Sequence, residues 1–204
     1  MTCPPPHGGG GGREADGGGL DARHPLRRCA PPPPHAEEDR KHGLPPIAHV
    51  SARVLVLGSL PGDASLAAAQ YYAHPQNSFW RLMGEVVGAP LAGIAYADRL
   101  GALEAAGVAL WDTIASARRP GSLDSAIADG TPADLAALVR RLPGLRAVGF
   151  NGQLAARHGT AALAHSGLAL VALPSSSPVH TMAFADKRAA WMALRAFLDV
   201  PGAG

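Results

Sequence analysis

Short apolar runs alternate with longer amphipathic stretches along most of this chain. Four of the runs are rich in β-branched or aliphatic residues and are followed by glycine, proline or polar residues, which is typical of buried strands. These runs cover residues 53–58, 108–112, 145–150 and 168–173. The stretches between and after them have helical spacing and cover residues 78–87, 96–106, 131–141, 153–158 and 185–198.

This alternation predicts an α/β fold, because parallel strands are joined by helices that pack on the faces of the sheet. We expect a three-layer α/β/α arrangement around a central four-stranded parallel sheet. The helix starts carry suitable caps: Asn77 or Ser78 before the first helix, and Thr131 followed by Pro132 before the third. Residues 113–130 are predicted to form a loop.

The first 46 residues have a different character. They contain a glycine run at 8–12 and a proline run at 31–34, and they lack apolar periodicity. Such a segment cannot bury a core, so residues 1–46 are predicted to be a disordered extension. Residues 47–204 are predicted to be a single folded domain.

The composition of the chain excludes several classes of protein. The formal net charge is only +2, so any binding to nucleic acid must depend on local arginines and backbone amides rather than on a generally basic surface. No apolar run reaches the roughly 20 residues of a membrane helix, and no signal peptide precedes the domain. Cys3 and Cys29 are too few for an iron–sulfur cluster. A cytoplasmic protein without membrane contact is expected.

Polar segments follow each of the four predicted strands. The segments are Gly58-Ser59-Leu60-Pro61-Gly62, Asp112-Thr113, Asn151-Gly152 and Pro174–His180. Ligands of open α/β sheets bind beyond the carboxyl ends of the strands, so we expect these segments to meet in one site. The Gly58–Gly62 loop matches neither a phosphate-binding Walker loop nor a dinucleotide fingerprint. It could approach a ligand with its backbone, or it could be a simple tight turn.

The chain's densest aromatic and polar stretch lies between Tyr71 and Trp80. An extruded base needs an aromatic face on which to stack and amides that read its edge, and this stretch offers both. The alternative is a helix start whose Phe79 and Trp80 pack into the core. Residues 175–180 could follow a phosphodiester backbone with hydroxyls and loop N–H groups, or they could be a surface turn.

Three of these motifs together resemble the uracil-DNA glycosylase superfamily. They are Gly58–Gly62, His74-Pro75-Gln76-Asn77-Ser78-Phe79-Trp80 and Leu173–Pro178. Tyr71-Tyr72, Gly121–Asp124 and Gly149–Gly152 are closer to its hypoxanthine (deoxyinosine) DNA glycosylase branch. The resemblance covers about residues 47–199.

The resemblance implies a role for each motif. Leu60 stands where many members carry Asp or Asn, and the branch implies that Asn77 acts instead. Asn77 and Asn151 are therefore the expected catalytic residues, with Asn151 also reading the base edge and Phe79 stacking on the base. The implied base pocket comprises Gly58, Ser59, Leu60, Pro61, Tyr72, Phe79 and Asn151. The implied DNA-backbone and intercalation loop comprises Ser175, Ser176, Ser177, Pro178, Val179 and His180.

The expected reaction is hydrolysis of the N-glycosidic bond of a deaminated base in DNA. The resemblance to the hypoxanthine branch implies that this base is hypoxanthine. Lys41 and Lys187, the chain's two lysines, do not lie at strand ends, so water rather than an amine is the expected nucleophile and no strand cleavage follows. No metal-ligand cluster or cofactor motif is found, and a monomer is expected. The alternatives are a uracil- or mismatch-specific glycosylase of the same superfamily, and a nucleotide-binding α/β module without catalysis.

Overall fold

The computed structural model describes residues 40–199. Residues 1–39 and 200–204 are outside the described part, and with them most of the predicted extension, including Cys3 and Cys29. None of the helices among the described residues is sufficiently long and apolar to cross a membrane.

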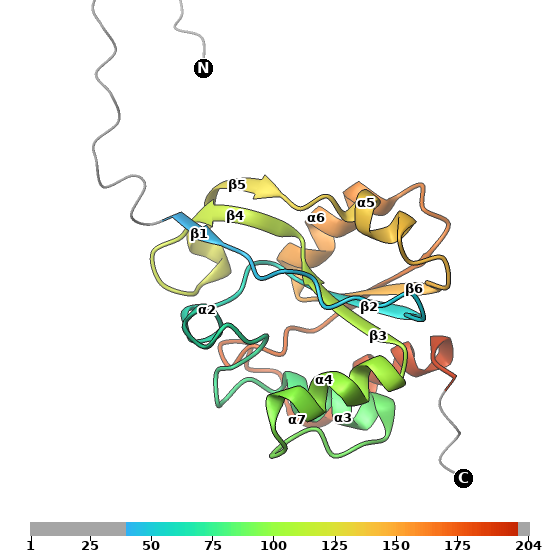
Figure 1. Ribbon diagram of the computed structural model, residues 1–204. Helices are drawn as coiled ribbons and strands as arrows, with labels where there is room; N and C mark the ends of the chain where they lie inside the picture. The colour runs from blue at the N-terminus through green and yellow to red at the C-terminus, as the bar shows by residue number, and fades with distance from the viewer. Residues whose placement is uncertain (1–39, 200–204) are drawn as a thin grey trace, which may run out of the picture. The chain divides into compact units, whose positions relative to one another are not determined.

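A four-stranded parallel sheet forms the centre of the domain (Figure 1). Its strands are β2 (Val54–Gly58), β3 (Val108–Asp112), β6 (Ala147–Asn151) and β7 (Ala169–Leu173), in the order β3-β2-β6-β7. Every residue of β2 and β6 is buried. This explains why both read as continuous apolar runs rather than as alternating ones.

Helices cover both faces of this sheet (Figure 1). On one face lie α3 (Phe79–Val87), α4 (Tyr96–Ala105), α7 (Phe184–Trp191) and the 3₁₀ helix η2 (Met192–Phe197). On the other lie α5 (Leu135–Arg140) and α6 (Gln153–Leu163). The predicted three-layer α/β fold is confirmed.

A second, antiparallel sheet lies outside the predicted architecture. It consists of β1 (Arg40–His42), β4 (Ile114–Arg118) and β5 (Ala128–Pro132), in the order β1-β4-β5. The prediction of a loop over 113–130 is therefore wrong, and so is the assignment of residues 40–42 to the extension. The three strands are short and mostly exposed on at least one side, so no apolar periodicity marks them. β1 also pairs with a strand that lies far away in sequence.

Several helix limits also differ from the expected ones. Thr131 and Pro132 end β5 rather than starting a helix, and Asp134 caps α5 by accepting a hydrogen bond from the Ala137 N–H at 2.8 Å. A short helix α2 (Asp63–Ala68) follows the first loop and was not expected. The closing helix changes to 3₁₀ geometry at Met192.

Candidate active site

A cavity of about 1130 Å3 opens at the carboxyl edge of the central sheet. All four strand-end segments contribute to its wall, as the topology predicted. Further walls come from Tyr71, Tyr72 and Asn77 ahead of α3, and from the loop 122–125 between β4 and β5. This last loop was not placed at the cavity by the strand rule, because it belongs to the second sheet.

The first loop packs tightly against the end of β3. Gly58 lies beside Asp112 in the register of the two strands, and a Cβ atom on Gly58 would lie 2.6 Å from Asp112 Oδ1. A side chain at position 58 would therefore displace the Asp112 carboxylate. The Leu60 side chain is 5% exposed and packs with Ile114 and Ala117, so it supplies no polar group to the cavity.

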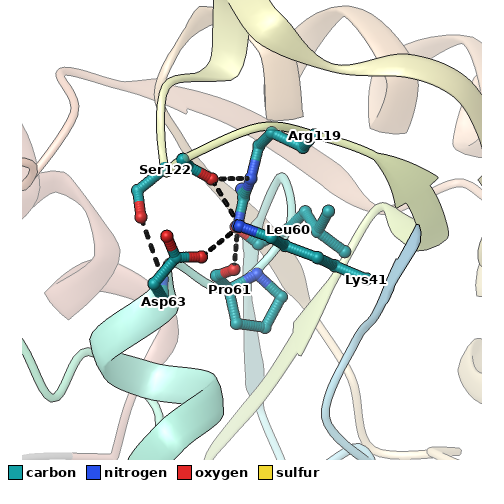
Figure 2. A network of polar contacts seen from close by, with 7 residues as sticks. Lys41, Leu60, Pro61, Asp63, Arg119 and Ser122 are labelled. Atoms are coloured by element: carbon teal, nitrogen blue, oxygen red, sulfur yellow. Dashed lines mark hydrogen bonds and ion pairs between the residues drawn. The ribbon is translucent and has the colours of Figure 1, made fainter. Parts of the chain in front are cut away.

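A buried arginine holds this loop in place (Figure 2). Arg119 is fully buried and donates hydrogen bonds to the carbonyl oxygens of Leu60 at 3.0 Å, Gly121 at 3.1 Å and Pro61. Its guanidinium thereby replaces the water that these carbonyls would otherwise need. The arginine fastens the first loop to the segment that follows β4.

The same network extends outward to β1. Lys41 Nζ contacts the carboxylate of Asp63 and donates to the Gly121 carbonyl at 2.7 Å, and the Asp63 N–H donates to Ser122 Oγ at 2.9 Å (Figure 2). The Lys41 ammonium lowers the pKa of Asp63. Residue 41 is therefore part of the loop scaffold and not of a detached tail.

The aromatic wall of the cavity is tyrosine. The ring of Tyr72 stacks on Phe79 with 3.6 Å between centroids and 14° between planes. Phe79 is fully buried and does not line the cavity, whereas Tyr72 does. Tyr72 also adopts a left-handed backbone with φ +53°, which is unfavourable for a residue with a large side chain. The structure thus does not bring Phe79 to the cavity surface.

Asn77 uses its two amide atoms differently. Its Oδ1 accepts a hydrogen bond from the Phe79 N–H at 3.0 Å, so the side chain helps to satisfy the start of α3. Within the described residues, its Nδ2 has no hydrogen-bond partner. Asn77 also lines the cavity. The capping and the ligand-binding interpretations of this residue are therefore compatible.

Asn151 is bound to the loop after β7. Its Nδ2 donates to Ser176 Oγ and its Oδ1 accepts from the Ser176 N–H, both at 2.8 Å. The side chain is buried at the carboxyl end of β6. In this structure Asn151 holds the loop in position, with one N–H left for a ligand.

The loop over residues 175–180 is fixed at its base and exposed at its tip. The Ser176 carbonyl accepts from the Ser78 N–H at 3.0 Å, the Pro174 carbonyl from Trp191 Nε1 at 2.9 Å, and the His180 carbonyl from Lys187 Nζ at 2.8 Å. The Val179 side chain is 67% exposed. A fixed loop that presents an apolar tip at a cavity mouth suits contact with a partner rather than with solvent.

Asp112 belongs to a strand-end segment that was expected at the site, but the sequence interpretation gave its carboxyl no role in the reaction. It ends β3, lines the cavity and is 4% exposed. Burial raises the pKa of its carboxyl to about 7. Its position at the end of an apolar strand was the signal that placed it at the site. Within residues 40–199, no three His, Cys, Asp or Glu residues are grouped so that they could hold a metal ion.

Comparisons with known proteins identify relatives of the whole described domain. The family model described as the uracil DNA glycosylase superfamily matches residues 45–197. A Methanosarcina barkeri protein named hypoxanthine DNA glycosylase is 36% identical over 152 residues, which is 74% of this chain and 96% of the relative. A Methanosarcina acetivorans protein of the same name is 36% identical over 154 residues, or 76% and 97%.

A solved structure agrees with these relatives. The solution NMR structure of a Methanosarcina acetivorans protein, described as a candidate uracil DNA glycosylase, matches with a TM-score of 0.70 and 35% identity. The match covers 76% of this chain and 96% of that one. The sequence comparison and the structure comparison therefore point to the same family.

Proposed function

Since this chain belongs to the uracil DNA glycosylase superfamily, it is a DNA glycosylase, and we propose that hypoxanthine is the base that it removes. The two relatives named hypoxanthine DNA glycosylase support this choice of base, because each is matched over almost its whole length at 36% identity. The substrate is then DNA that contains deoxyinosine, and the products are free hypoxanthine and an abasic site. The family match leaves no support for a non-catalytic nucleotide-binding module.

The cavity at the strand ends is the observation that carries the proposal. Pockets for small ligands measure roughly 300–1,000 Å3, and this one, at about 1130 Å3, has room for an extruded nucleotide rather than for a base alone. Its wall combines a tyrosine ring with amides and hydroxyls. A base that leaves a duplex is held by such a combination of stacking and edge contacts.

Asn77 and Asn151 are proposed to act on opposite sides of the reacting bond. The Nδ2 of Asn77 is available to orient the attacking water, and its position is fixed through the bond from Phe79 to Oδ1. Asn151 keeps one N–H for the base edge while it holds Ser176. Hydrogen bonds to the departing base and to the water stabilise a transition state in which the sugar becomes positive and the base negative.

The loop over residues 175–180 is proposed to hold the DNA. Its serine hydroxyls and N–H groups are suitable donors for phosphate oxygens, and Val179 is placed to fill the stack that the extruded base vacates. The fixed base of the loop makes this contact possible without a large ordering cost.

Hydrolysis without strand cleavage is proposed, because both lysines are occupied. Lys187 Nζ is bound to the carbonyls of His180 at 2.8 Å and Ser177 at 3.4 Å, and Lys41 is bound to Asp63. An amine nucleophile would have to leave these partners to form a Schiff base. Water needs no such rearrangement.

Uracil is the second candidate base, and the solved relative described as a candidate uracil DNA glycosylase favours it. Uracil also has carbonyl oxygens that can accept hydrogen bonds from these amides, so Asn151 alone does not discriminate between uracil and hypoxanthine. The substrate preference is therefore a quantity to measure on matched oligonucleotides.

The test is a panel of duplexes that differ in one base. We expect the protein, in excess EDTA, to release base from a deoxyinosine duplex and to leave alkali-labile sites, with slower release from uracil, xanthine and G·T duplexes. Asn77→Ala, prepared in parallel, should lose the activity and so exclude a contaminating glycosylase. Faster release of uracil than of hypoxanthine would overturn the proposed base. Dependence on an added divalent ion would overturn the metal-free mechanism.

A further inference from the structure

Asp112 lies at the floor of the cavity with one carboxylate oxygen unpartnered. Its Oδ2 is buried and makes no hydrogen bond to the described part of the chain, and the same holds for the hydroxyls of Tyr72 and of the adjacent Thr113. A Cβ atom built on Gly58 would lie 2.6 Å from Asp112 Oδ1 and 3.2 Å from the Tyr72 hydroxyl, so both side chains reach the backbone of Gly58. Unpartnered buried polar atoms destabilise a fold, and a cluster of them at a ligand cavity indicates a function.

The charged and titratable groups around Asp112 come from three other segments. Tyr71 and Tyr72 lie ahead of α3, Arg119 follows β4, and Asp124 lies in the 3₁₀ helix η1 (Asp124–Ala126). Burial is the largest influence and raises the pKa of Asp112 to about 7, with Asp124 acting in the same direction and Tyr71 and Arg119 opposing it. Near neutral pH, a large fraction of Asp112 therefore carries a proton.

We propose that Asp112 is the general acid of base excision and gives its proton to N7 of a purine. This assignment rests on the proposed function, and it deepens that function by naming purines as the substrate class. Asn77 and Asn151 are neutral amides and have no proton to give. A carboxylic acid that lines the same cavity supplies what they lack.

The proposed step balances as a hydrolysis. The proton moves from the Asp112 carboxyl to N7 while the bond between C1′ and N9 breaks, and the electron pair of that bond goes to N9. The purine then leaves as a neutral molecule rather than as an anion. Water adds to C1′ and releases one proton, which restores the acid form of Asp112. Uracil has no imidazole ring, so this route is open only to purines.

The first measurement is single-turnover release of hypoxanthine from a deoxyinosine duplex between pH 5.5 and 9. The wild-type rate constant should fall about tenfold per pH unit well above pH 7, because the acid form disappears. Asp112→Asn should be about 10²-fold slower at pH 6 and should lack this pH dependence. Asp129→Asn is the matched control, since it neutralises an exposed carboxylate of β5 away from the cavity and should behave as wild type.

The second measurement uses a duplex with 7-deazadeoxyinosine, whose base cannot be protonated at position 7. Wild type should release this base about 10²-fold more slowly than hypoxanthine, and Asp112→Asn should cause no further loss. Wild type tests the base's N7 directly, so the result stands even if Asp112→Asn folds poorly.

The outcomes separate the two proposals. If wild type releases no hypoxanthine at any pH, the proposed function fails and the role of Asp112 fails with it. If wild type releases hypoxanthine and Asp112→Asn matches its rate and pH profile, only the general-acid assignment is overturned. An equal loss from Asp112→Asn on the natural and the 7-deaza substrates would also overturn it, because the proton would then not go to N7.

Discussion

Asn77 combines a structural and a proposed catalytic task in one amide. The oxygen is engaged by the Phe79 N–H at 3.0 Å, while the nitrogen has no partner among residues 40–199. The two roles of Asn77 differ in the free energy that each contributes. Loss of a helix-capping side chain costs about 0.5–2 kcal/mol of stability, whereas loss of a catalytic donor costs roughly 3–4 kcal/mol of transition-state stabilisation.

Asn77→Ala should therefore lower single-turnover excision by about 10²-fold or more, with a melting temperature reduced by only a few degrees. Asn77→Asp should melt near the wild-type temperature, because aspartate also accepts the Phe79 N–H bond, and should still excise slowly, because a carboxylate lacks the donor. Excision and thermal melting are measured on the same preparations. An Asn77→Ala protein that melts early but excises at the wild-type rate would show that the residue is only a cap.

Asp112 should also make stability depend on pH. Its folded-state pKa is raised from 3.8 to about 7, so the unfolded state releases the proton first as pH rises. The free energy of unfolding that this group contributes is therefore fully present below about pH 4 and is lost as pH rises to about 7.

Asp112→Asn removes this titration. The difference in stability between pH 5 and pH 8 should be smaller in the variant than in wild type, by at most about 3 kcal/mol, since each pH unit contributes about 1.4 kcal/mol. Urea unfolding at both pH values measures the difference, and comparison within each protein cancels the direct effect of the substitution. Equal pH dependence in both proteins would mean that Asp112 is ionised in the folded state.

Among the elements, the first loop depends on a side chain from the segment that follows β4. Arg119 donates to three carbonyls, two of which belong to the first loop. Arg119→Met keeps much of the volume but leaves the buried carbonyls of Leu60 and Pro61 without this donor, so a loss of about 2–4 kcal/mol is expected. Arg118→Met is the control, because Arg118 makes an exposed ion pair with Asp129 and should change stability by less than about 1 kcal/mol. Equal stability of the two variants would refute the role of Arg119.

The loop over residues 175–180 is held at its base by hydrogen bonds and carries the exposed apolar side chain of Val179 at its tip. Val179→Ala should slow excision from duplex DNA about tenfold, because less surface fills the vacated stack, and should affect single-stranded DNA much less. Val50→Ala is a suitable control, since Val50 is 74% exposed and lies ahead of β2, away from the cavity. An equal loss of excision rate on single-stranded and double-stranded DNA would contradict the proposal that Val179 fills the vacated stack.

At the scale of the whole molecule, the question is at which residue the functional domain begins. The composition of residues 1–46 predicts that they are dispensable for chemistry, whereas β1 at Arg40–His42 lies in this range, pairs with β4 and carries Lys41. Deletion of 1–39 should leave excision rates within about twofold of the full chain. Deletion of 1–46 should lower the melting temperature, because an edge strand and the Lys41 contacts are removed. A large catalytic loss from the shorter deletion would place the extension in the site.

The central sheet and the position of the site could be predicted from the sequence because both follow local rules. Strands buried on both faces are continuous apolar runs, and the chain's own alternation of strand and helix makes those strands parallel. The ends of parallel strands then meet at one edge, so the four polar segments converge without any knowledge of side-chain packing.

Only the tertiary structure decided the contacts between segments that lie far apart in the chain. The second sheet pairs Arg40–His42 with a strand more than 70 residues later, and its strands are too short and polar to be marked by periodicity. The same reason applies within the site. The Tyr72 ring stacks on Phe79, Ser176 is hydrogen-bonded to Asn151, and burial raises the pKa of Asp112. A side chain's partners and its solvation are set by its neighbours in space, and one sequence read in order does not contain them.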